Sequence, residues 1–127
     1  MEPISKKILI IEDEKPLARA LELKLTHEGF QVVNIPNGEV ALPLLEKEEF
    51  LLIICDLMMP KVDGFQVLEF IKNKNIKTPV VMLTNLSQEE DEKHVRALGA
   101  SEFFIKSNTP ISKIVEYVKE KVGQMNS

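Results

Sequence analysis

The chain has 127 residues, of which 44% are hydrophobic and 28% are charged, enough for one globular domain with its own core but not comfortably for two. Its 16 lysines and arginines are outnumbered by 20 aspartates and glutamates, and this net charge of -4 gives no general attraction for nucleic acid or anionic lipid. Cys55 is the only cysteine, which excludes an internal disulfide and a cysteine metal cluster. Because no apolar run approaches membrane-spanning length, we expect a cytoplasmic protein.

Short apolar runs alternate with amphipathic stretches five times along the chain. This alternation predicts an α/β domain, in which a parallel sheet is doubly wound and carries helices on both faces. The runs are rich in Val, Ile, Leu and Phe, which favour strands. We predict strands at residues 7–11, 31–35, 51–55, 79–83 and 103–105. The first, third and fourth are the most apolar and are predicted to be the most buried.

The intervening stretches show the periodicity of helices. Leu17, Leu21 and Leu25 are spaced four apart, and a three-four stripe of Ile and Val runs through 111–122, so both stretches are predicted to pack on the sheet. The last helix is predicted to begin with Thr109 as its N-cap and Pro110 at its first position.

Two further helices are less regular. Pro43 lies inside the stretch 37–46, where it removes one backbone hydrogen bond and is predicted to kink the helix. The stretch 87–98 has few large apolar residues and is predicted to be weakly anchored. A loosely held, exposed helix of this kind can serve as a switch.

The candidate chemistry lies where the strands end, because ligands on open α/β sheets bind at the carboxyl ends of strands. If the strands lie in the order 2-1-3-4-5, four polar strand ends converge on one crevice. These are Glu12-Asp13-Glu14, Asp56, Thr84-Asn85 and Lys106-Ser107-Asn108.

Carboxylates brought this close repel one another, and the pocket then either raises a pKa or binds a cation. Oxygen ligands indicate Mg²⁺, which prefers about six oxygens and keeps several waters, so two carboxylates and the backbone carbonyl of Met58 would suffice. Asp56 is then a candidate nucleophile toward phosphorus. An ammonium from Lys106 would offset phosphoryl charge, and the Thr84 hydroxyl would donate to a phosphoryl oxygen.

Over essentially its whole length the chain resembles the receiver domain of two-component response regulators. The resemblance rests on four ordered signals, which are Ile8-Leu9-Ile10-Ile11-Glu12-Asp13-Glu14, Asp56-Leu57-Met58-Met59-Pro60 with Asp63-Gly64, Leu83-Thr84, and Gly99-Ala100-Ser101-Glu102-Phe103-Phe104-Ile105-Lys106. It implies a flavodoxin-like fold with strand order 2-1-3-4-5 and five helices.

The resemblance also implies the roles of the site residues. Asp56 is expected to accept a phosphoryl group from a partner histidine kinase or phosphotransfer protein, and Asp13 and Asp56 to ligate Mg²⁺, with Glu12 acting directly or through water. Thr84 and Phe103 are expected to form a switch pair. In this family the hydroxyl moves toward the phosphoryl group and the aromatic ring turns inward, which alters the face built from the fourth helix, fifth strand and fifth helix.

The family resemblance also sets expectations for the domain and its partners. We expect residues 1–127 to form a single receiver domain, with a core at about 6–122 and no output domain, which is a signalling domain and not a classical enzyme. Its output is then contact with a downstream protein, and the switching face is a candidate for homodimerisation.

Departures from the family pattern occur at four positions. Ser107 follows the lysine where the family usually has proline, often in a cis peptide, and a cis bond to serine would cost about 3 to 4 kcal/mol. Asn85 replaces the small residue that commonly follows the switch hydroxyl. Met58 and Leu86 are apolar and cannot orient an attacking water, which predicts slow self-dephosphorylation.

Simpler and rival interpretations remain beside this one. Taken singly, Thr84 is a helix cap, Lys106 a solvated charge and Phe103 a core residue. A Mg²⁺ phosphatase or mutase would usually carry a second acid at position 58, and a flavodoxin-like cofactor carrier would not place three acids after its first strand. The alternative that we keep is a receiver-like adaptor that binds partners without phosphorylation, because Ser107 and Asn85 depart from the family pattern.

Overall fold

The computed structural model describes residues 7–85 and 89–125, and in this part of the chain five parallel strands form one sheet in the order β2-β1-β3-β4-β5. The strands are β1 (Lys7–Ile11), β2 (Gln31–Ile35), β3 (Leu52–Asp56), β4 (Val80–Thr84) and β5 (Glu102–Ile105). The predicted strand order and fold class are therefore confirmed.

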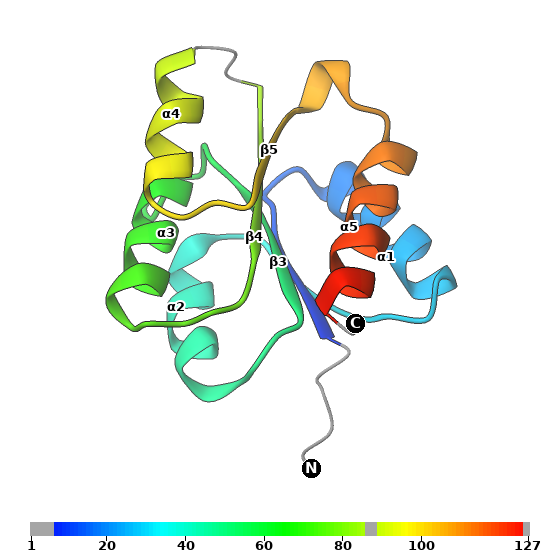
Figure 1. The fold of residues 1–127 in the computed structure, drawn as a ribbon, viewed down its shortest axis with the longest axis horizontal. Helices are drawn as coiled ribbons and strands as arrows, with labels where there is room; N and C mark the ends of the chain where they lie inside the picture. The colour runs from blue at the N-terminus through cyan, green and yellow to red at the C-terminus, as the bar shows by residue number, and fades with distance from the viewer. Residues whose placement is uncertain (1–6, 86–88, 126–127) are drawn as a thin grey trace.

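Helices cover both faces of the sheet (Figure 1). They are α1 (Lys15–His27), α2 (Gly38–Lys47), α3 (Gly64–Asn73), α4 (Glu89–Ala97) and α5 (Ile111–Met125), and a 3-10 turn, η1 (Lys106–Asn108), follows β5. In Figure 1, α1 and α5 lie on one side of the sheet and α2, α3 and α4 on the other.

The core consists of two apolar layers, one on each face of the sheet. Residues of α1 and α5, such as Leu21 and Val118, pack on one face, and residues of α2 and α3, such as Leu45 and Leu68, pack on the other. Burying such a side chain contributes roughly 1.5–3 kcal/mol. All residues of β3 and β4 and all but Lys7 of β1 are buried, whereas β2 and β5 are half-buried edges, as predicted.

Several predicted boundaries differ from the structure by one residue, because hydrophobic runs do not mark where strand pairing stops. Asp56 and Thr84 are the last residues of β3 and β4, not the first residues beyond them. The last helix starts at Ile111 instead of Pro110, and the Pro110 carbonyl accepts its first i to i+4 bond from Ile114.

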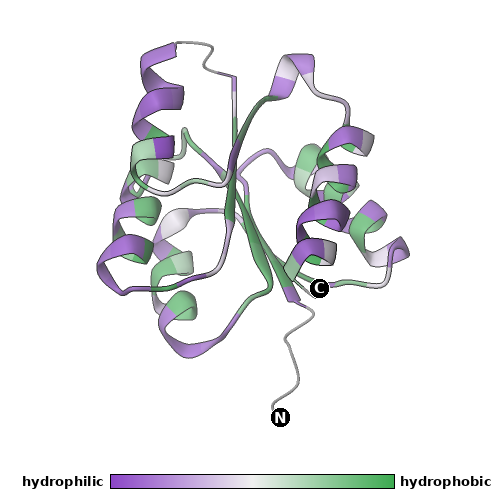
Figure 2. Ribbon diagram, viewed as in Figure 1, coloured by the Kyte–Doolittle hydropathy of each residue, from purple (hydrophilic) through white to green (hydrophobic). Residues whose placement is uncertain are grey.

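The two irregular helices also differ from their predicted forms. α2 runs continuously from Gly38 to Lys47 with Pro43 inside it, and the predicted kink at Pro43 stays a prediction. α4 covers 89–97, whereas the prediction for Ser87 and Gln88 lies outside the described residues. Val95 is the only buried residue of α4, and Figure 2 shows this helix as mostly hydrophilic, which agrees with the few apolar residues on which the prediction of weak anchoring rests. No helix in the described ranges is long and apolar enough to cross a membrane.

Candidate phosphoacceptor site

The carboxyl edge of the sheet gathers the polar strand ends that the sequence singles out. β3 lies between β1 and β4, with Cys55 paired to Ile11 and Asp56 paired to Leu83. Thr84 pairs with Ile105, which places Lys106 directly beyond the end of β5. Because all these strands are parallel and in adjacent register, their following residues meet at one edge.

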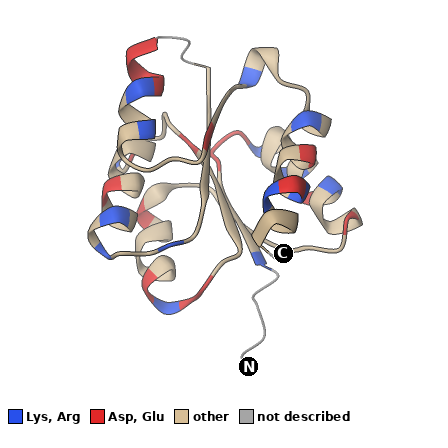
Figure 3. Ribbon diagram, in the orientation of Figure 1, with Lys and Arg blue, Asp and Glu red and all other residues tan. Residues whose placement is uncertain are grey.

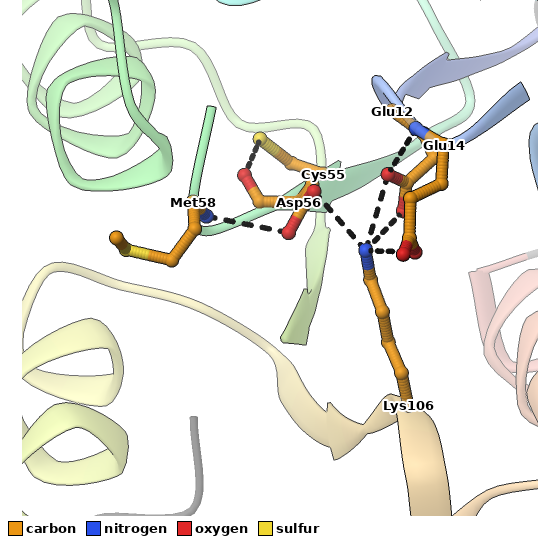
Figure 4. Close-up of polar contacts among 6 residues, drawn as sticks. All are labelled: Glu12, Glu14, Cys55, Asp56, Met58 and Lys106. Atoms are coloured by element: carbon orange, nitrogen blue, oxygen red, sulfur yellow. Dashed lines mark hydrogen bonds and ion pairs between the residues drawn. The ribbon is translucent and has the colours of Figure 1, made fainter. Parts of the chain in front are cut away.

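Lys106 connects the acidic residues of this edge (Figure 4). Its Nζ lies 3.1 Å from Asp56 Oδ2, 2.8 Å from Glu12 Oε1 and 2.8 Å from Glu14 Oε2. The Lys106 side chain is only 9% exposed. Burial lowers the pKa of its ammonium, but the hydrogen bonds that the ammonium donates to Glu12, Glu14 and Asp56 outweigh burial and raise that pKa above its usual value, so Lys106 stays charged.

Asp56 is a buried carboxylic acid, with 3% of its surface exposed. Its Oδ1 accepts a bond of 3.3 Å from the Met58 amide, on the side opposite Lys106 in Figure 4. Burial, followed by the hydrogen bond and charge of Glu12, raises the pKa of Asp56 to about 8. Lys106 opposes this rise but does not cancel it. Without a further cation, ionisation of all the carboxyl groups in this cluster is therefore unfavourable in the folded protein.

Glu12, Asp13 and Asp56 form a cluster that fits a cation. One carboxylate oxygen from each lies within 4.8 Å of the others. Glu12 Oε1 is buried and accepts no hydrogen bond from any described residue, although Lys106 Nζ is 2.8 Å away. A hard divalent cation prefers such oxygens, and its charge would offset the repulsion that raises the Asp56 pKa. The residues present therefore fit Mg²⁺.

The two candidate switch residues lie on the neighbouring strands β4 and β5. Thr84 is fully buried at the end of β4. Phe103 is paired in register with Met82, two residues before Thr84, so Phe103 and Thr84 share one face of the sheet. Only 8% of the Phe103 surface is exposed, and the ring packs in the core layer beneath α2 and α3. The Phe103 side chain is thus a buried core residue in this structure.

Comparison with known proteins decides the family. The family described as response regulator receiver domain matches residues 8–119. The chain belongs to this family. The receiver domain of Francisella response regulator 1452 superposes with a TM-score of 0.88 at 26% identity, and the match covers 94% of this chain and 98% of that one.

This receiver domain also has curated full-length relatives. It is 38% identical over 105 residues to the probable transcriptional regulator ycf27 of Porphyridium aerugineum, covering 83% of this chain and 43% of that protein. It is 34% identical over 107 residues to the alkaline phosphatase synthesis transcriptional regulatory protein PhoP of Bacillus subtilis (strain 168), covering 84% and 45%. The chain spans less than half the length of these relatives, and the absence of an output domain stays a prediction.

Ser107 does not prevent the lysine of this receiver domain from reaching the site. No peptide bond among the described residues is cis, and Lys106–Asn108 forms the 3-10 turn η1. Lys106 nevertheless contacts Asp56 at 3.1 Å. Serine at position 107 is therefore compatible with a Lys106 side chain that points toward Asp56.

Two of the other departures, Asn85 and Met58, line a small cavity beside Asp56. It has a volume of about 180 Å³, and Asn85 and Met58 line it together with Asp13, Glu14, Asp56 and Lys106. The Met58 side chain is 56% exposed and offers no polar group to this space. Leu86 lies outside the described residues.

Glu14 is a site residue whose role sequence reasoning assigned elsewhere. An acid at this position is usually read as a capping residue, and Glu14 is the N-cap residue of α1, but its side chain makes no capping bond. It instead contacts Lys106 Nζ at 2.8 Å, and its backbone N–H donates to Glu12 Oε2 at 3.0 Å. The signal for this role was its spacing, since Glu14 is the third acid in succession after β1.

Proposed function

We propose that this domain is a phosphorylation switch in which Asp56 accepts a phosphoryl group from a histidine kinase or phosphotransfer protein. The observation that carries the proposal is the position of Asp56 at the end of a strand, next to Lys106. Asp56 is buried, with 3% of its surface exposed, and Lys106 Nζ lies 3.1 Å from its Oδ2. Membership of the receiver family supports phosphoacceptor signalling in general. The role of each residue is our assignment.

In the proposed reaction, a carboxylate oxygen of Asp56 bonds to phosphorus as the bond from phosphorus to the donor histidine nitrogen breaks. That nitrogen keeps the electron pair and takes up a proton, which leaves an acyl phosphate on Asp56. Lys106 offsets phosphoryl charge, and the Thr84 hydroxyl donates to a phosphoryl oxygen. The domain thus catalyses its own phosphorylation. Because Met58 and Leu86 cannot orient an attacking water, hydrolysis of the acyl phosphate is slow.

The acidic cluster supports a requirement for Mg²⁺. Glu12, Asp13, Asp56 and the backbone carbonyl of Met58 would hold the ion. When bound, it supplies positive charge that offsets the carboxylates and the transferring phosphoryl group. The ionised Asp56 that the reaction needs is disfavoured without it, because the pKa of Asp56 is raised to about 8.

The expected output is a rearranged surface made by α4, β5 and α5. α4 is held by one buried residue, Val95, and an exposed ion pair of 2.7 Å joins Arg96 to Glu102 of β5. Exposed pairs of this kind contribute about 0–1 kcal/mol, so a coupling of about 1–3 kcal/mol can shift the helix. We propose that Thr84 and Phe103 transmit this shift to a downstream protein or to a second copy.

The alternative of a phosphorylation-independent adaptor rested on Ser107 and Asn85. Because Lys106 contacts Asp56 despite Ser107, Asn85 is the remaining departure that favours the adaptor. Asn85 is exposed and lines the small cavity beside Asp56, where we propose that its bulk narrows the access of a phosphodonor to Asp56.

Intact-mass spectrometry tests the proposal. The protein is treated with a small acyl phosphate, with and without Mg²⁺, and a single phosphoryl adduct that requires Mg²⁺ is expected. Asp56→Asn is expected to form none. Asp63→Asn is the matched control, since Asp63 is the N-cap of α3 and asparagine caps equally well. An adduct on Asp56→Asn would refute the assignment, and no adduct with either a phosphoryl donor or a set of purified kinases would favour the adaptor.

A further inference from the structure

A second cavity lies at the opposite end of the sheet from Asp56. Its volume is about 550 Å³, within the range of about 300–1,000 Å³ that is typical of small-molecule sites. It lies between the connection from α3 to β4 and the connection from α4 to β5, and it is closed on one side by residues of α5. Val80 lines it at the start of β4, whereas Thr84 at the end of the same strand belongs to the phosphoacceptor edge.

The wall of this cavity is apolar where it meets the core. Leu68 and Ile71 of α3, Val80 of β4, and the half-buried Ile76 and Leu98 contribute its apolar lining. A wall of this kind gains free energy when an apolar group displaces water from it.

Three lysines supply the charge of the cavity. Lys72, Lys77 and Lys121 line it, and no aspartate or glutamate among the described residues does, in a chain that carries an acidic excess. None of the three forms an ion pair with a carboxylate in the described part of the chain, whereas Lys74 nearby is paired with Glu46 at 3.0 Å. Figure 3 shows blue segments at the end of α3 and along the connection to β4.

A neighbouring cavity shows that this charge pattern is local. That cavity has a volume of about 370 Å³ and shares Lys77 and Thr78 with the first, but Glu48 and Glu49 also line it. Glu48 is paired with Lys7 at 2.7 Å, and Glu49 offsets the charge of the shared Lys77, so this cavity has no excess of positive charge. An anion is therefore attracted to the larger cavity and not to the smaller one.

We propose that the larger cavity, lined by Lys72, Lys77 and Lys121, binds a small amphipathic anion, with an apolar body against Ile71 and Val80 and a carboxylate, sulfonate or phosphate group among the lysines. The three ammonium groups have no carboxylate partner among the described residues, although Lys77 donates to Asn75 Oδ1 at 3.1 Å, and they select the charge of the ligand. The apolar wall selects its body. The site is separate from Asp56 and does not depend on phosphorylation.

The probe is anilinonaphthalene sulfonate, titrated by fluorescence into the folded protein. Single saturable binding is expected, with amide NMR shifts confined to the cavity and affinity that falls as salt is added. The matched probe is phenylnaphthylamine, which has the same ring system without the sulfonate. It is expected to bind at least about tenfold more weakly, a difference of about 1.4 kcal/mol.

The decisive variant is Lys72→Gln/Lys77→Gln/Lys121→Gln, expected to raise the Kd for the sulfonate at least about tenfold. Its matched control is Lys24→Gln/Lys47→Gln/Lys113→Gln, which removes the same charge from exposed positions outside the cavity and is expected to change the Kd little. Ala97→Phe, which fills the cavity from α4 without changing charge, is expected to abolish binding.

Three results would overturn the proposal: equal affinities in the two triple variants, equal affinities for the two probes, or NMR shifts at another surface. Asp56→Asn is expected to bind the sulfonate as wild type does. A failure of phosphorylation at Asp56 would therefore leave this result untouched, and the two proposals can fail independently.

Discussion

Lys106 Nζ lies 3.1 Å from Asp56 Oδ2 although β5 and β3, which carry these residues to the site, are separated in the sheet by β4. The lysine therefore reaches across the end of the strand that holds Thr84. The same ammonium contacts Glu12 and Glu14, so one positive charge serves three carboxylates. This imbalance determines how the site responds to pH, to cations and to substitution.

Replacing Lys106 tests that imbalance directly. Lys106→Met leaves the carboxylates without their shared cation, and it is expected to lower the free energy of unfolding by about 1 to 3 kcal/mol at neutral pH. The value is below that of a fully buried pair because Glu14 is half exposed. Urea unfolding measures the loss, and Lys113→Met, at an exposed position, is the control. Equal stabilities of the two variants would show that Lys106 is only a solvated charge.

The raised pKa of Asp56 predicts how stability depends on pH. Asp56 in the unfolded chain ionises near its ordinary value of about 3.9, whereas in the folded protein its pKa is about 8. Between these values the folded state binds the additional proton, so the free energy of unfolding falls as pH rises from about 4 to about 8. Asp56→Asn removes this loss and is expected to be at least about 1 kcal/mol more stable than wild type near pH 8.

Urea unfolding at about pH 5 and about pH 8 measures this effect. Asp63→Asn is the control, because Asp63 caps α3 and does not belong to the cluster. Mg²⁺ is expected to stabilise wild type near pH 8 and to stabilise Asp56→Asn much less. If the stability of Asp56→Asn depended on pH in the same way as that of wild type, the raised pKa of Asp56 would be contradicted.

Thr84→Ala tests the separation of phosphorylation from signalling. The variant keeps Asp56 and Lys106, so we expect it to be phosphorylated but to lose the phosphorylation-dependent difference in partner affinity. Thr84 is fully buried, and its truncation is also expected to cost about 1–2 kcal/mol of stability. Thr84→Ser, which retains the hydroxyl, is the matched control. The measurement is the affinity for a partner with and without phosphorylation. If phosphorylation changed the affinity of Thr84→Ala as much as that of wild type, the assignment of Thr84 as a switch residue would be wrong.

Met58 and Leu86 are predicted to lengthen the life of the phosphorylated state, because neither can orient an attacking water. Met58→Asn/Leu86→Asn is expected to shorten that lifetime severalfold, as measured by loss of the phosphoryl adduct over time. Met58 is 56% exposed, so its substitution is not expected to disturb the core. Met58→Leu/Leu86→Met preserves apolar character and serves as the control. A lifetime that the polar substitutions leave unchanged would count against the mechanism.

Lys61 is held in the left-handed region, with φ of 69°, in the connection between β3 and α3. A residue with a Cβ is disfavoured there, whereas glycine is not. Lys61→Gly is therefore expected to raise the free energy of unfolding by about 0.5–1 kcal/mol, after the entropic cost of glycine. The lost ion pair with Glu39 is 3.5 Å long and exposed, so it matters little. Lys61→Ala should show no such gain in urea unfolding, and a gain of equal size would point to charge instead of backbone strain.

The sequence by itself predicted the elements and the composition of the candidate site. Apolar runs located all five strands to within one residue, and periodicity located the core faces of α1 and α5, because burial of apolar side chains is recorded locally in the chain. Asp56 and Lys106 could be nominated because parallel strands end at one edge. The predicted bounds of β4 and the predicted start of α5 each differ from the structure by one residue, because strand pairing and packing determine where an element begins and ends.

Only the tertiary structure decided which side chains meet. Glu14 contacts Lys106 because the parallel strands β1 and β5 end at the same edge of the sheet and the long lysine side chain reaches across the strands between them, a relationship between residues 92 positions apart. Phe103 is buried because its strand position directs it into the core layer that also contains Leu68 and Val95. Residues of α3, α4 and α5 line the cavity that contains the three lysines, and no local sequence pattern indicates that these helices meet there. Hydrophobic patterning acts over a few residues, whereas such contacts depend on strand register and on side-chain direction across the whole sheet.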